Sequence, residues 1–496
     1  MATEDKLPFP GFVGPSYQGR SKRFDAMRCV NYYVEVDEAG GAGQPGQGKN
    51  QQPYVLIGTP GLRKLQAIGT GPIRALYTLS NLEVTIVVSG SSVFQLNGPT
   101  SPPTLLTGNL RTNNGPVSIA DNGVQVVLVD GQFGYYQTIG TTVLNDIVDP
   151  NFYPSDTVTF QDGYFILNQS GTTNFFISDL YSVDFLPLNQ SAKTGNSDIL
   201  KAVISLNRQL YLLGAKTVEI WWDAGASGSS PFQRQDGRFS QQGCIAPASV
   251  AILQESFYWL SSNAQGGGVV MGLVNAMPQR ISTHAVEFSL QGAGDLSRAT
   301  AYTYQQEGHF FYVLSVPGLN TTWVYDAAAN LWAERQSSTS GLIGRHLGSS
   351  HAYLGSTHLI GDYRNGNLYA YDLDTYTDNN EPLPRIRVTP HAALNGYNVF
   401  MALMELDFQF GVGLVDDGVN PSYNVTPKVT LEVSEDGAET WSLPIEGSLG
   451  RIGAFNTRAR FDRLGSAYDP VFRVTVTDAV KCQLLSCMLQ VEKGNA

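Results

Sequence analysis

This chain of 496 residues has few cysteines. The four, at positions 29, 244, 482 and 487, form no C-x-x-C pair and match no zinc-ligand spacing. Four are too few for a disulfide scaffold in a chain of this length, so we expect reduced thiols buried in the core of a protein made in a cytoplasm. Cys482 and Cys487 could form a disulfide bridge, but we favour the interpretation that both residues occupy positions in a β-strand ladder.

Charged residues make up only 15% of the chain, and the net charge is −12. This balance argues against a basic face that grips nucleic acid. It does not exclude a wall past which DNA slides, because an acidic surface repels phosphates. No run of about 18 apolar residues occurs, so we expect no membrane insertion. The N-terminus, M-A-T-E-D-K-L-P-F-P-G, lacks the apolar core of a secretory signal.

Signatures of catalysis and metal binding are missing too. The six histidines form no His-x-x-x-His pair, and no Gly-x-Ser-x-Gly nucleophile motif occurs. The segment H-L-G-S-S-H (346–351) matches no metal-ligand spacing. G-G-G (266–268) is followed by neither Lys-Ser/Thr nor a helix, so we interpret it as a turn. The sequence therefore predicts no catalytic residue, no metal and no cofactor.

A glycosidase would need a pair of carboxylates. Asp362 and Asp372 flank D-Y-R-N-G-N-L-Y-A-Y-D, but the Asn-Gly pair inside it is a hairpin signal, so turn chemistry is the favoured interpretation. A sialidase would also need clustered arginines for the substrate carboxylate. Four arginines lie near one another in sequence, at positions 345, 364, 385 and 387. A glycan-binding or glycan-hydrolysing β-propeller is therefore the alternative function.

Glycine and aromatic residues are abundant, with 52 Gly, 24 Tyr and 23 Phe, and helical periodicity is nearly absent. Short apolar runs bounded by Gly, Asn and Asp recur every 40–50 residues between about 71 and 380. They lie at 84–88, 124–129, 164–167, 210–213, 257–260, 310–314 and, more weakly, 351–360. We interpret each as the first strand of a propeller blade, which predicts six or seven blades. The longer unit at 245–298 indicates an insertion. A stack of β-sandwiches is the alternative.

Both flanks break this period. Residues 1–65 are rich in Pro and Gly and contain a loop, 38–53, that we expect to be flexible. Residues 385–496 hold longer alternating strands, at 401–410, 428–433, 471–476 and 482–491. The alternation predicts a separate antiparallel β-sandwich.

Residues 434–441, S-E-D-G-A-E-T-W, are close to the Asp-box hairpin of sialidase-type propellers. Ser434, Asp436, Thr440 and Trp441 match that box, and Ala438 stands where its glycine should be. The segment lies in the predicted sandwich, outside the propeller. We therefore expect a structural hairpin in which Ser434 and Asp436 bond backbone groups, Gly437 takes a positive φ, and Trp441 packs back over the turn.

The one concentration of basic residues is Q-G-R-S-K-R-F-D-A-M-R (18–28), with Arg20, Lys22, Arg23 and Arg28. It is either a solvated loop or a segment that docks on an acidic partner ring. Contact with phosphates is a third interpretation, which the acidic remainder of the chain weakens.

Three stretches, in an order that covers the chain nearly end to end, carry a family resemblance. They are S-Y-Q-G-R-S-K-R-F-D-A-M-R-C-V-N-Y-Y-V-E (16–35) with G-T-P-G-L (58–62), then 361–390, then 427–441 with R-L-G (463–465) and V-F-R-V-T-V (471–476). Together they resemble the tail nozzle, or packaged-DNA stabilisation, proteins of short-tailed bacteriophages. The family usually has a double glycine where this chain has Gly437-Ala438, and a proline where it has Val34.

The resemblance implies a structural, non-catalytic protein of the virion tail, assembled in the host bacterial cytoplasm. It implies a homohexamer below the portal and its adaptor ring, through which double-stranded DNA leaves and which a plug or needle closes until ejection. Residues 1–65 would pair with 385–496 in a platform beside the adaptor, docked through the basic segment. Residues 66–384 would form the propeller, on which a tail fibre or tailspike docks. Low charge suits large apolar ring contacts of this kind.

Overall fold

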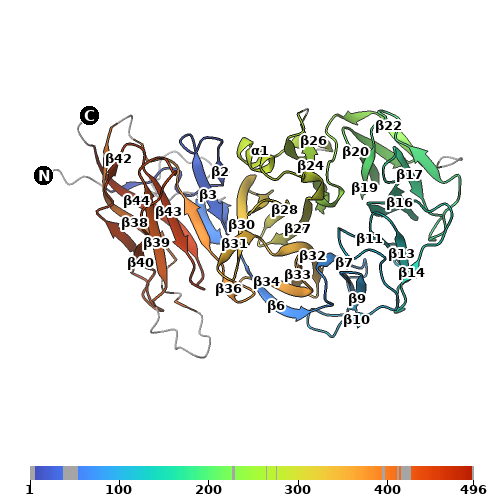
Figure 1. The fold of residues 1–496 in the computed structure, drawn as a ribbon, viewed down its shortest axis with the longest axis horizontal. Coiled ribbons are helices and arrows are strands. Elements are labelled where there is room, and N and C mark those ends of the chain that lie inside the picture. The colour runs from blue at the N-terminus through green and yellow to red at the C-terminus, as the bar shows by residue number, and fades with distance from the viewer. Residues whose placement is uncertain are drawn as a thin grey trace, which may run out of the picture.

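The computed structural model describes residues 6–36, 54–225, 230–393 apart from positions 264 and 275, 397–409, 411, 413, 414 and 426–493. The loop at 38–53 lies outside these described residues. Two β-rich bodies lie side by side, a ring of small sheets and a sandwich that contains both ends of the chain (Figure 1). The predicted all-β fold class, a propeller with an antiparallel sandwich, is confirmed. Among the described residues the one α-helix has eight residues, and no helix there is long enough to cross a membrane.

Seven four-stranded units form the blades of the ring. The first strands lie nearest the axis and contact those of adjacent blades. They are β7 (Ile73–Thr78), β11 (Ser118–Asp121), β15 (Val158–Gln161), β19 (Leu200–Leu206), β23 (Ala251–Leu253), β27 (Thr300–Gln306) and β32 (Gly348–Leu354). The second strands are β8 (Thr85–Ser89), β12 (Gln125–Val129), β16 (Tyr164–Asn168), β20 (Gln209–Gly214), β24 (Ser256–Ser262), β28 (His309–Ser315) and β33 (Thr357–Asp362).

The third and fourth strands complete each blade toward the rim. The third strands are β9 (Ser92–Leu96), β13 (Gly134–Thr138), β17 (Asn174–Ile177), β21 (Val218–Asp223), β25 (Gly268–Val274), β29 (Thr322–Asp326) and β34 (Asn367–Asp372). The fourth strands are β10 (Thr104–Leu105), β14 (Asn145–Asp146), β18 (Gln190–Ala192), β22 (Phe232–Ser240), β26 (Met277–Arg280), β30 (Leu331–Thr339) and β6 (Gly61–Ala67).

The solid apolar runs in the sequence are second strands, not the first strands that we expected. In β8, Ile86 and Val88 pack in the cluster shared with the following blade, whereas Val87 packs in the cluster shared with the preceding one. A strand buried on both faces needs apolar residues at every position. Apolar clusters fill the spaces between consecutive blades all round the ring.

The last blade is closed by a strand from the other end of the propeller. β6 pairs antiparallel with β34, from Asn367 opposite Ala67 to Asp372 opposite Gly61. The ring is therefore closed by main-chain hydrogen bonds between segments about 300 residues apart. The domain boundary that we expected at 65/66 falls within β6, and the exact division into domains stays a prediction.

The long unit at 245–298 adds a helix, α1 (His284–Gln291), after β26. Thr283 caps it, because the Thr283 side chain accepts a hydrogen bond from the backbone N–H of Val286. Val286 and Leu290 lie in the apolar cluster between this blade and the next, so the insertion packs on the propeller.

Both sheets of the sandwich mix strands from the two ends of the chain. One contains β4 (Tyr32–Val36), β5 (Tyr54–Gly58), β44 (Gln483–Lys493), β38 (Val399–Phe408) and β41 (Ala459–Asp462), with β1 (Leu7–Pro8) and β42 (Ser466–Ala467) at its margins. The other contains β3 (Ala26–Val30), β37 (Arg385–Val388), β43 (Val471–Val476), β39 (Lys428–Ser434) and β40 (Ile445–Ser448), with β2 (Tyr17–Gln18) beside β3.

A single core of apolar residues fills the space between these two sheets. Cys29, Cys482 and Cys487 lie in it, and Cys244 lies in the propeller. All four thiols are buried and free, as expected. Cys482 immediately precedes β44, which contains Cys487.

Candidate docking surface

The predicted basic segment forms a hairpin turn between β2 and β3, in which Tyr17 pairs with Met27. The backbone N–H of Phe24 donates to the Ser21 carbonyl, and that of Gly19 donates to the Asp25 carbonyl. The turn holds the ring of Phe24 76% exposed. A turn fixed by its own hydrogen bonds and carrying an exposed aromatic ring resembles the preorganised anchors of protein interfaces.

The four basic residues of this segment have different surroundings. Arg28 makes a two-pronged ion pair with the buried Glu334 of β30, at 2.6 and 3.1 Å. Lys22 pairs with Glu439 at 3.1 Å, where both side chains are partly exposed. Arg20 and Arg23 are exposed and make no ion pair among the described residues. Arg28 therefore joins the sandwich to the propeller, and Arg20 and Arg23 remain available to a partner.

The Asp-box segment forms the turn that sequence reasoning expected, in the connection between β39 and β40, which pair antiparallel from Leu431 opposite Ile445 to Lys428 opposite Ser448. The Asp436 carboxylate accepts the backbone N–H groups of Glu439 and Thr440 and the Thr440 hydroxyl, at 2.6–3.1 Å. It also accepts the Ser434 hydroxyl at 2.8 Å. These bonds hold the pKa of Asp436 well below its usual range. Trp441 is half-buried, with the Arg473 guanidinium 4.4 Å above its ring.

The Asp-box turn lies against the basic turn. Gly437 has φ +77°, and a Cβ there would lie 3.1 Å from the Arg23 side chain and 3.2 Å from the Asp469 carboxylate. His391 joins the two, because its Nδ1 contacts Asp469 at 2.6 Å and its Nε2 contacts the Lys22 carbonyl at 2.7 Å. The structure thus brings together two features that the sequence separates by more than 400 residues, and it gives the Asp-box a supporting role.

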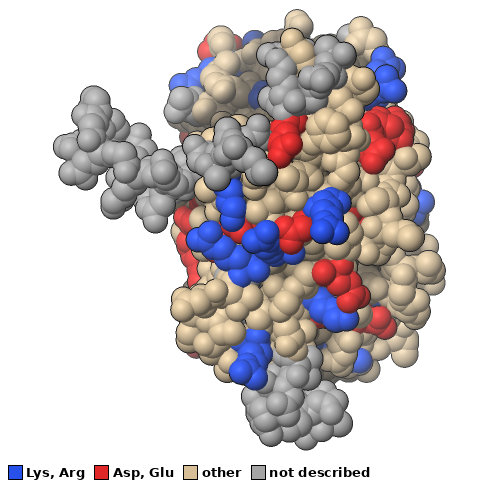
Figure 2. All heavy atoms as spheres, turned by 90° about the vertical axis from the view of Figure 1, so that its left-hand side faces the viewer, with Lys and Arg blue, Asp and Glu red and all other residues tan. Residues whose placement is uncertain are grey.

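A second group of basic residues lies on the outer face of the sandwich and was missed by the sequence reasoning. Lys6 and Arg458 both pair with Glu405, at 2.6 and 3.7 Å. Arg460 pairs with Asp462 at 2.8 Å and lies opposite Glu405 in the β38–β41 register. Figure 2 shows this end of the molecule, with Lys and Arg side chains gathered across its middle. The run R-A-R-F-D-R (458–463) is a local signal for Arg458 and Arg460, whereas only the fold brings Lys6 beside them.

The residues of a possible glycosidase site do not form one. Asp362 is fully buried and is bonded by Tyr369 at 2.8 Å and by Arg364 at 3.3 Å. Asp372 pairs with Arg63 of β6 at 2.7 Å. The two carboxylates are therefore separate structural partners of the last blade.

The four arginines of that hypothesis do not gather at one site, although Arg345 and Arg364 both lie near the Tyr363 ring. Arg345 stacks 3.7 Å above the Tyr363 ring, and Arg364 pairs with Asp362. Arg385 and Arg387 are buried in the sandwich sheet, where Arg387 donates to the carbonyls of Phe12, Gly14 and Gly11. These bonds pin the N-terminal segment onto β37.

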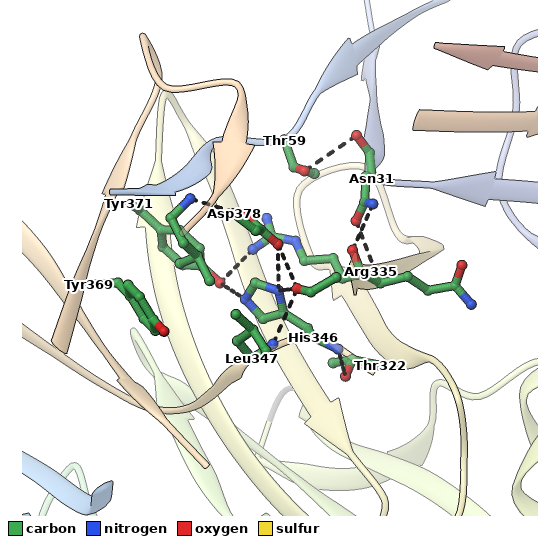
Figure 3. A network of polar contacts seen from close by, with 12 residues as sticks. Asn31, Thr59, Thr322, Arg335, His346, Leu347, Tyr369, Tyr371 and Asp378 are labelled. Carbon is green, nitrogen blue, oxygen red and sulfur yellow. Dashed lines mark hydrogen bonds and ion pairs between the residues drawn. The ribbon is translucent and has the colours of Figure 1, made fainter. Parts of the chain in front are cut away.

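A buried polar network joins the sandwich to the propeller (Figure 3). Arg335, 2% exposed, donates to the hydroxyls of Tyr371, at 2.6 Å, and Tyr304. The Tyr371 hydroxyl also contacts His346 Nε2 at 2.9 Å. Burial, reinforced by the positive charge of Arg335, lowers the pKa of His346 and keeps its ring neutral. His346 is thus part of a structural network, and no group of three potential metal ligands occurs among the described residues.

The same network fixes how the two bodies meet. The Asn31 side chain, just after β3, donates to the carbonyls of Gln336 and Pro384 at 2.8 and 2.7 Å. Val30 pairs with Glu334 across β3 and β30, so one sandwich sheet continues into a blade. Displacing the sandwich would leave buried polar groups without hydrogen-bond partners, and each such group would cost about 1–3 kcal/mol of stability. The junction is therefore stiff.

Two family models match the chain. One, described as bacteriophage P22 Gp10, beta-propeller, matches residues 45–376, and the other, described as bacteriophage P22 Gp10, beta-sandwich, matches residues 384–492. No curated protein matches the chain significantly. Among solved structures, the N-terminal domain of Nup159 has a TM-score of 0.39 and 10% identity, covering 66% of this chain and 96% of its own. The designed Ika8 protein has a TM-score of 0.37 and 12% identity, covering 70% and 100%. Neither likeness is close enough to argue from.

Proposed function

The chain belongs to the bacteriophage P22 Gp10 family and is a structural component of a phage tail, and we propose that it forms the tail nozzle. In this proposal six copies form a ring below the portal and its adaptor, retain the packaged DNA and form the channel for its ejection. The observation that carries it is the pair of family matches, which together span residues 45–376 and 384–492. The chain would enter the virion after assembly in the host bacterial cytoplasm.

The two-body architecture supports a tube that must stay aligned under the pressure of packaged DNA. Asn31 and Arg28 of the sandwich bond to Gln336 and Glu334 of the propeller, and Arg335 joins the neighbouring strands β30 and β34 of the propeller beside this junction. Each sandwich would therefore carry its propeller at a fixed angle. A ring of six copies would bear six times the net charge of −12, and an acidic wall does not retain passing phosphates.

We assign the adaptor contact to the basic turn, with Phe24 as the apolar anchor and Arg20 and Arg23 as its flanking charges. Phe24 is 76% exposed, and neither arginine has an acidic partner among the described residues. An aromatic ring flanked by arginines has the composition of an interface hot spot. The fitting partner is an apolar pocket with an acidic rim. A plug or needle at the far end of the channel, and a tail fibre or tailspike on the propeller, complete the proposed neighbours.

The test combines the purified chain with adaptor-capped portal from its own phage. We expect rings of six copies on the adaptor in negative-stain images and in mass photometry. Phe24→Ala should weaken adaptor binding by about 2 kcal/mol, or roughly thirtyfold. Arg20→Glu with Arg23→Glu should slow association, most strongly at low salt. Lys64→Glu, an exposed charge reversal on β6, is the matched control and should bind normally.

Genetic removal tests DNA retention separately. Particles that lack this chain should lose packaged DNA to added nuclease, whereas complemented particles should protect it. A strictly monomeric protein that binds no adaptor ring would contradict the nozzle assignment. Normal binding by the Phe24→Ala variant would refute only the assigned contact.

A further inference from the structure

A cavity of about 370 Å³ lies where the first strands of several blades begin, and residues that precede or begin β7, β11, β27 and β32 line it. Its wall comes from six of the seven blades. Three prolines that precede first strands form part of this wall, namely Pro72, Pro116 and Pro247, and Pro317, which follows β28, also lines it. Glycines at positions 115, 131 and 348 also line it and leave backbone accessible. The cavity is large enough for a small molecule and stands apart from the sandwich and its docking turn.

Some charged side chains around this cavity are hydrogen-bonded to neighbouring protein groups, and others are not. Arg74 is engaged, since its guanidinium donates to the carbonyls of Gly115, Gly90 and Thr112 at 2.7–2.9 Å. Asp130 is engaged as well, because it accepts two backbone N–H groups and the hydroxyls of Thr112 and Tyr135. Both groups therefore build the wall.

Arg298 and Arg345 also line the cavity, and their side chains make no hydrogen bond or ion pair among the described residues. Hydrogen bonds from the Ser297 hydroxyl and N–H, at 2.7 and 2.9 Å, lower the pKa of Asp295, and the charge of Arg298 adds a smaller effect in the same direction. Arg345 lies flat on Tyr363, which fixes the guanidinium plane and leaves its N–H edge unpaired.

The remaining acid of the wall lies on another blade. Asp156, at the start of the third blade, accepts hydrogen bonds through one carboxylate oxygen from Asn168 and Ser170 at 3.1 and 2.7 Å. Arg298 precedes β27, and Arg345 is the last residue of β31 (Leu342–Arg345), which pairs with β30, so both arginines belong to the sixth blade. The cavity thus has a cationic side and, on the third blade, an acidic side.

We propose that this cavity binds a small organic or inorganic anion, a carboxylate or phosphate on a molecule no larger than a monosaccharide, through Arg298 and Arg345. Two guanidinium groups form charge-assisted hydrogen bonds to such an oxyanion. The carboxylate of Asp156 faces the same cavity and can accept from a ligand hydroxyl. This arrangement selects a ligand with an acidic end and a hydroxylated end, such as a sugar acid, over a neutral sugar.

The experiment titrates the full-length protein with galacturonate, with inorganic phosphate and with galactose, using isothermal titration calorimetry at constant ionic strength. We expect one of the two anions or both to bind with a Kd on the order of 1 mM or lower, and galactose to bind at least tenfold more weakly. Galacturonate alone would identify a carboxylated sugar as the ligand class, and phosphate alone would identify a phosphate.

Arg298→Gln and Arg345→Gln should each weaken anion binding at least tenfold. The matched control is Arg208→Gln, which removes an arginine 84% exposed on the propeller and paired with Asp162; it should bind like the original protein. Absence of binding by both anions, equal binding of galactose, or equal loss in the Arg208→Gln variant would overturn the proposal. Thermal unfolding of each variant, expected within about 2 °C of the original, separates lost binding from lost structure.

Discussion

His309 links the sandwich to the propeller and should make their junction sensitive to alkaline pH. Its Nδ1 contacts Asp326 of β29 at 2.6 Å and its Nε2 contacts Glu35 of β4 at 2.8 Å. Burial opposes the charged form of the ring, but hydrogen bonds from its N–H groups to the Asp326 and Glu35 carboxylates outweigh that effect and raise the pKa of His309 to about 9. Tyr33 packs edge-on to the imidazole with centroids 4.8 Å apart, and its hydroxyl donates to Glu307.

The sign of the effect follows from the raised pKa. The pKa of His309 rises from its ordinary value of 6.5 to about 9 when the protein folds. Protonated His309 therefore stabilises the folded state, and this stabilisation is complete below pH 6.5. This stabilisation is lost as the pH rises through about 9. At about 1.4 kcal/mol per pKa unit the shift corresponds to about 3 kcal/mol. Because Glu35 is 42% exposed and its half of the contact is screened by water, we expect about 2 kcal/mol.

The assay compares the original protein with His309→Gln in urea unfolding at pH 6.5, 8 and 9.5. The difference between them is measured, because a chain with two bodies need not unfold in one step. We expect the free energy of unfolding of the original protein to exceed that of His309→Gln by about 2 kcal/mol at pH 6.5. The difference should be smaller at pH 8 and nearly zero at pH 9.5. His284→Gln, on the exposed face of α1, is the control and should show no such pH dependence. A difference that stays constant from pH 6.5 to 9.5 would refute the charged-histidine account.

Three further substitutions test other parts of the structure. Lys193→Met should destabilise the fourth blade by about 3–5 kcal/mol in thermal unfolding, because Asp198 and Glu219 would lose their buried cation. A loss of stability under 1 kcal/mol would contradict this role of Lys193. Trp441→Ala should lower stability by only about 1–3 kcal/mol, since the ring is half-buried, and should also weaken adaptor binding by loosening the basic turn. Unimpaired assembly would contradict that support role. Arg387→Met should release the N-terminal segment, seen as faster tryptic cleavage at Lys6 without loss of the propeller's thermal transition.

The sequence by itself determined the β architecture and its repeat. Strands such as β8 and β12 lie between two neighbouring blades and are buried on both faces, so they read as solid apolar runs at a regular spacing. β39 and β43, buried on one face of the sandwich, show the alternation that predicted them. The Asp436 turn was predictable as well, because the hydrogen bonds of the Asp436 side chain are all local.

Only the tertiary structure decided what depends on contacts between distant segments. β6 has no local feature that assigns it to the last blade, and its pairing with β34 is what closes a ring of seven. Arg345 and Arg298 share a cavity because β31, which ends at Arg345, pairs with β30 of the blade that Arg298 precedes. Arg385 and Arg387 lie at a similar distance from Arg345 along the chain but are buried in the sandwich. Local patterns record which faces a strand buries. Strand register and ring closure decide which charged side chains lie together. No local sequence pattern contains information on the register or on the closure.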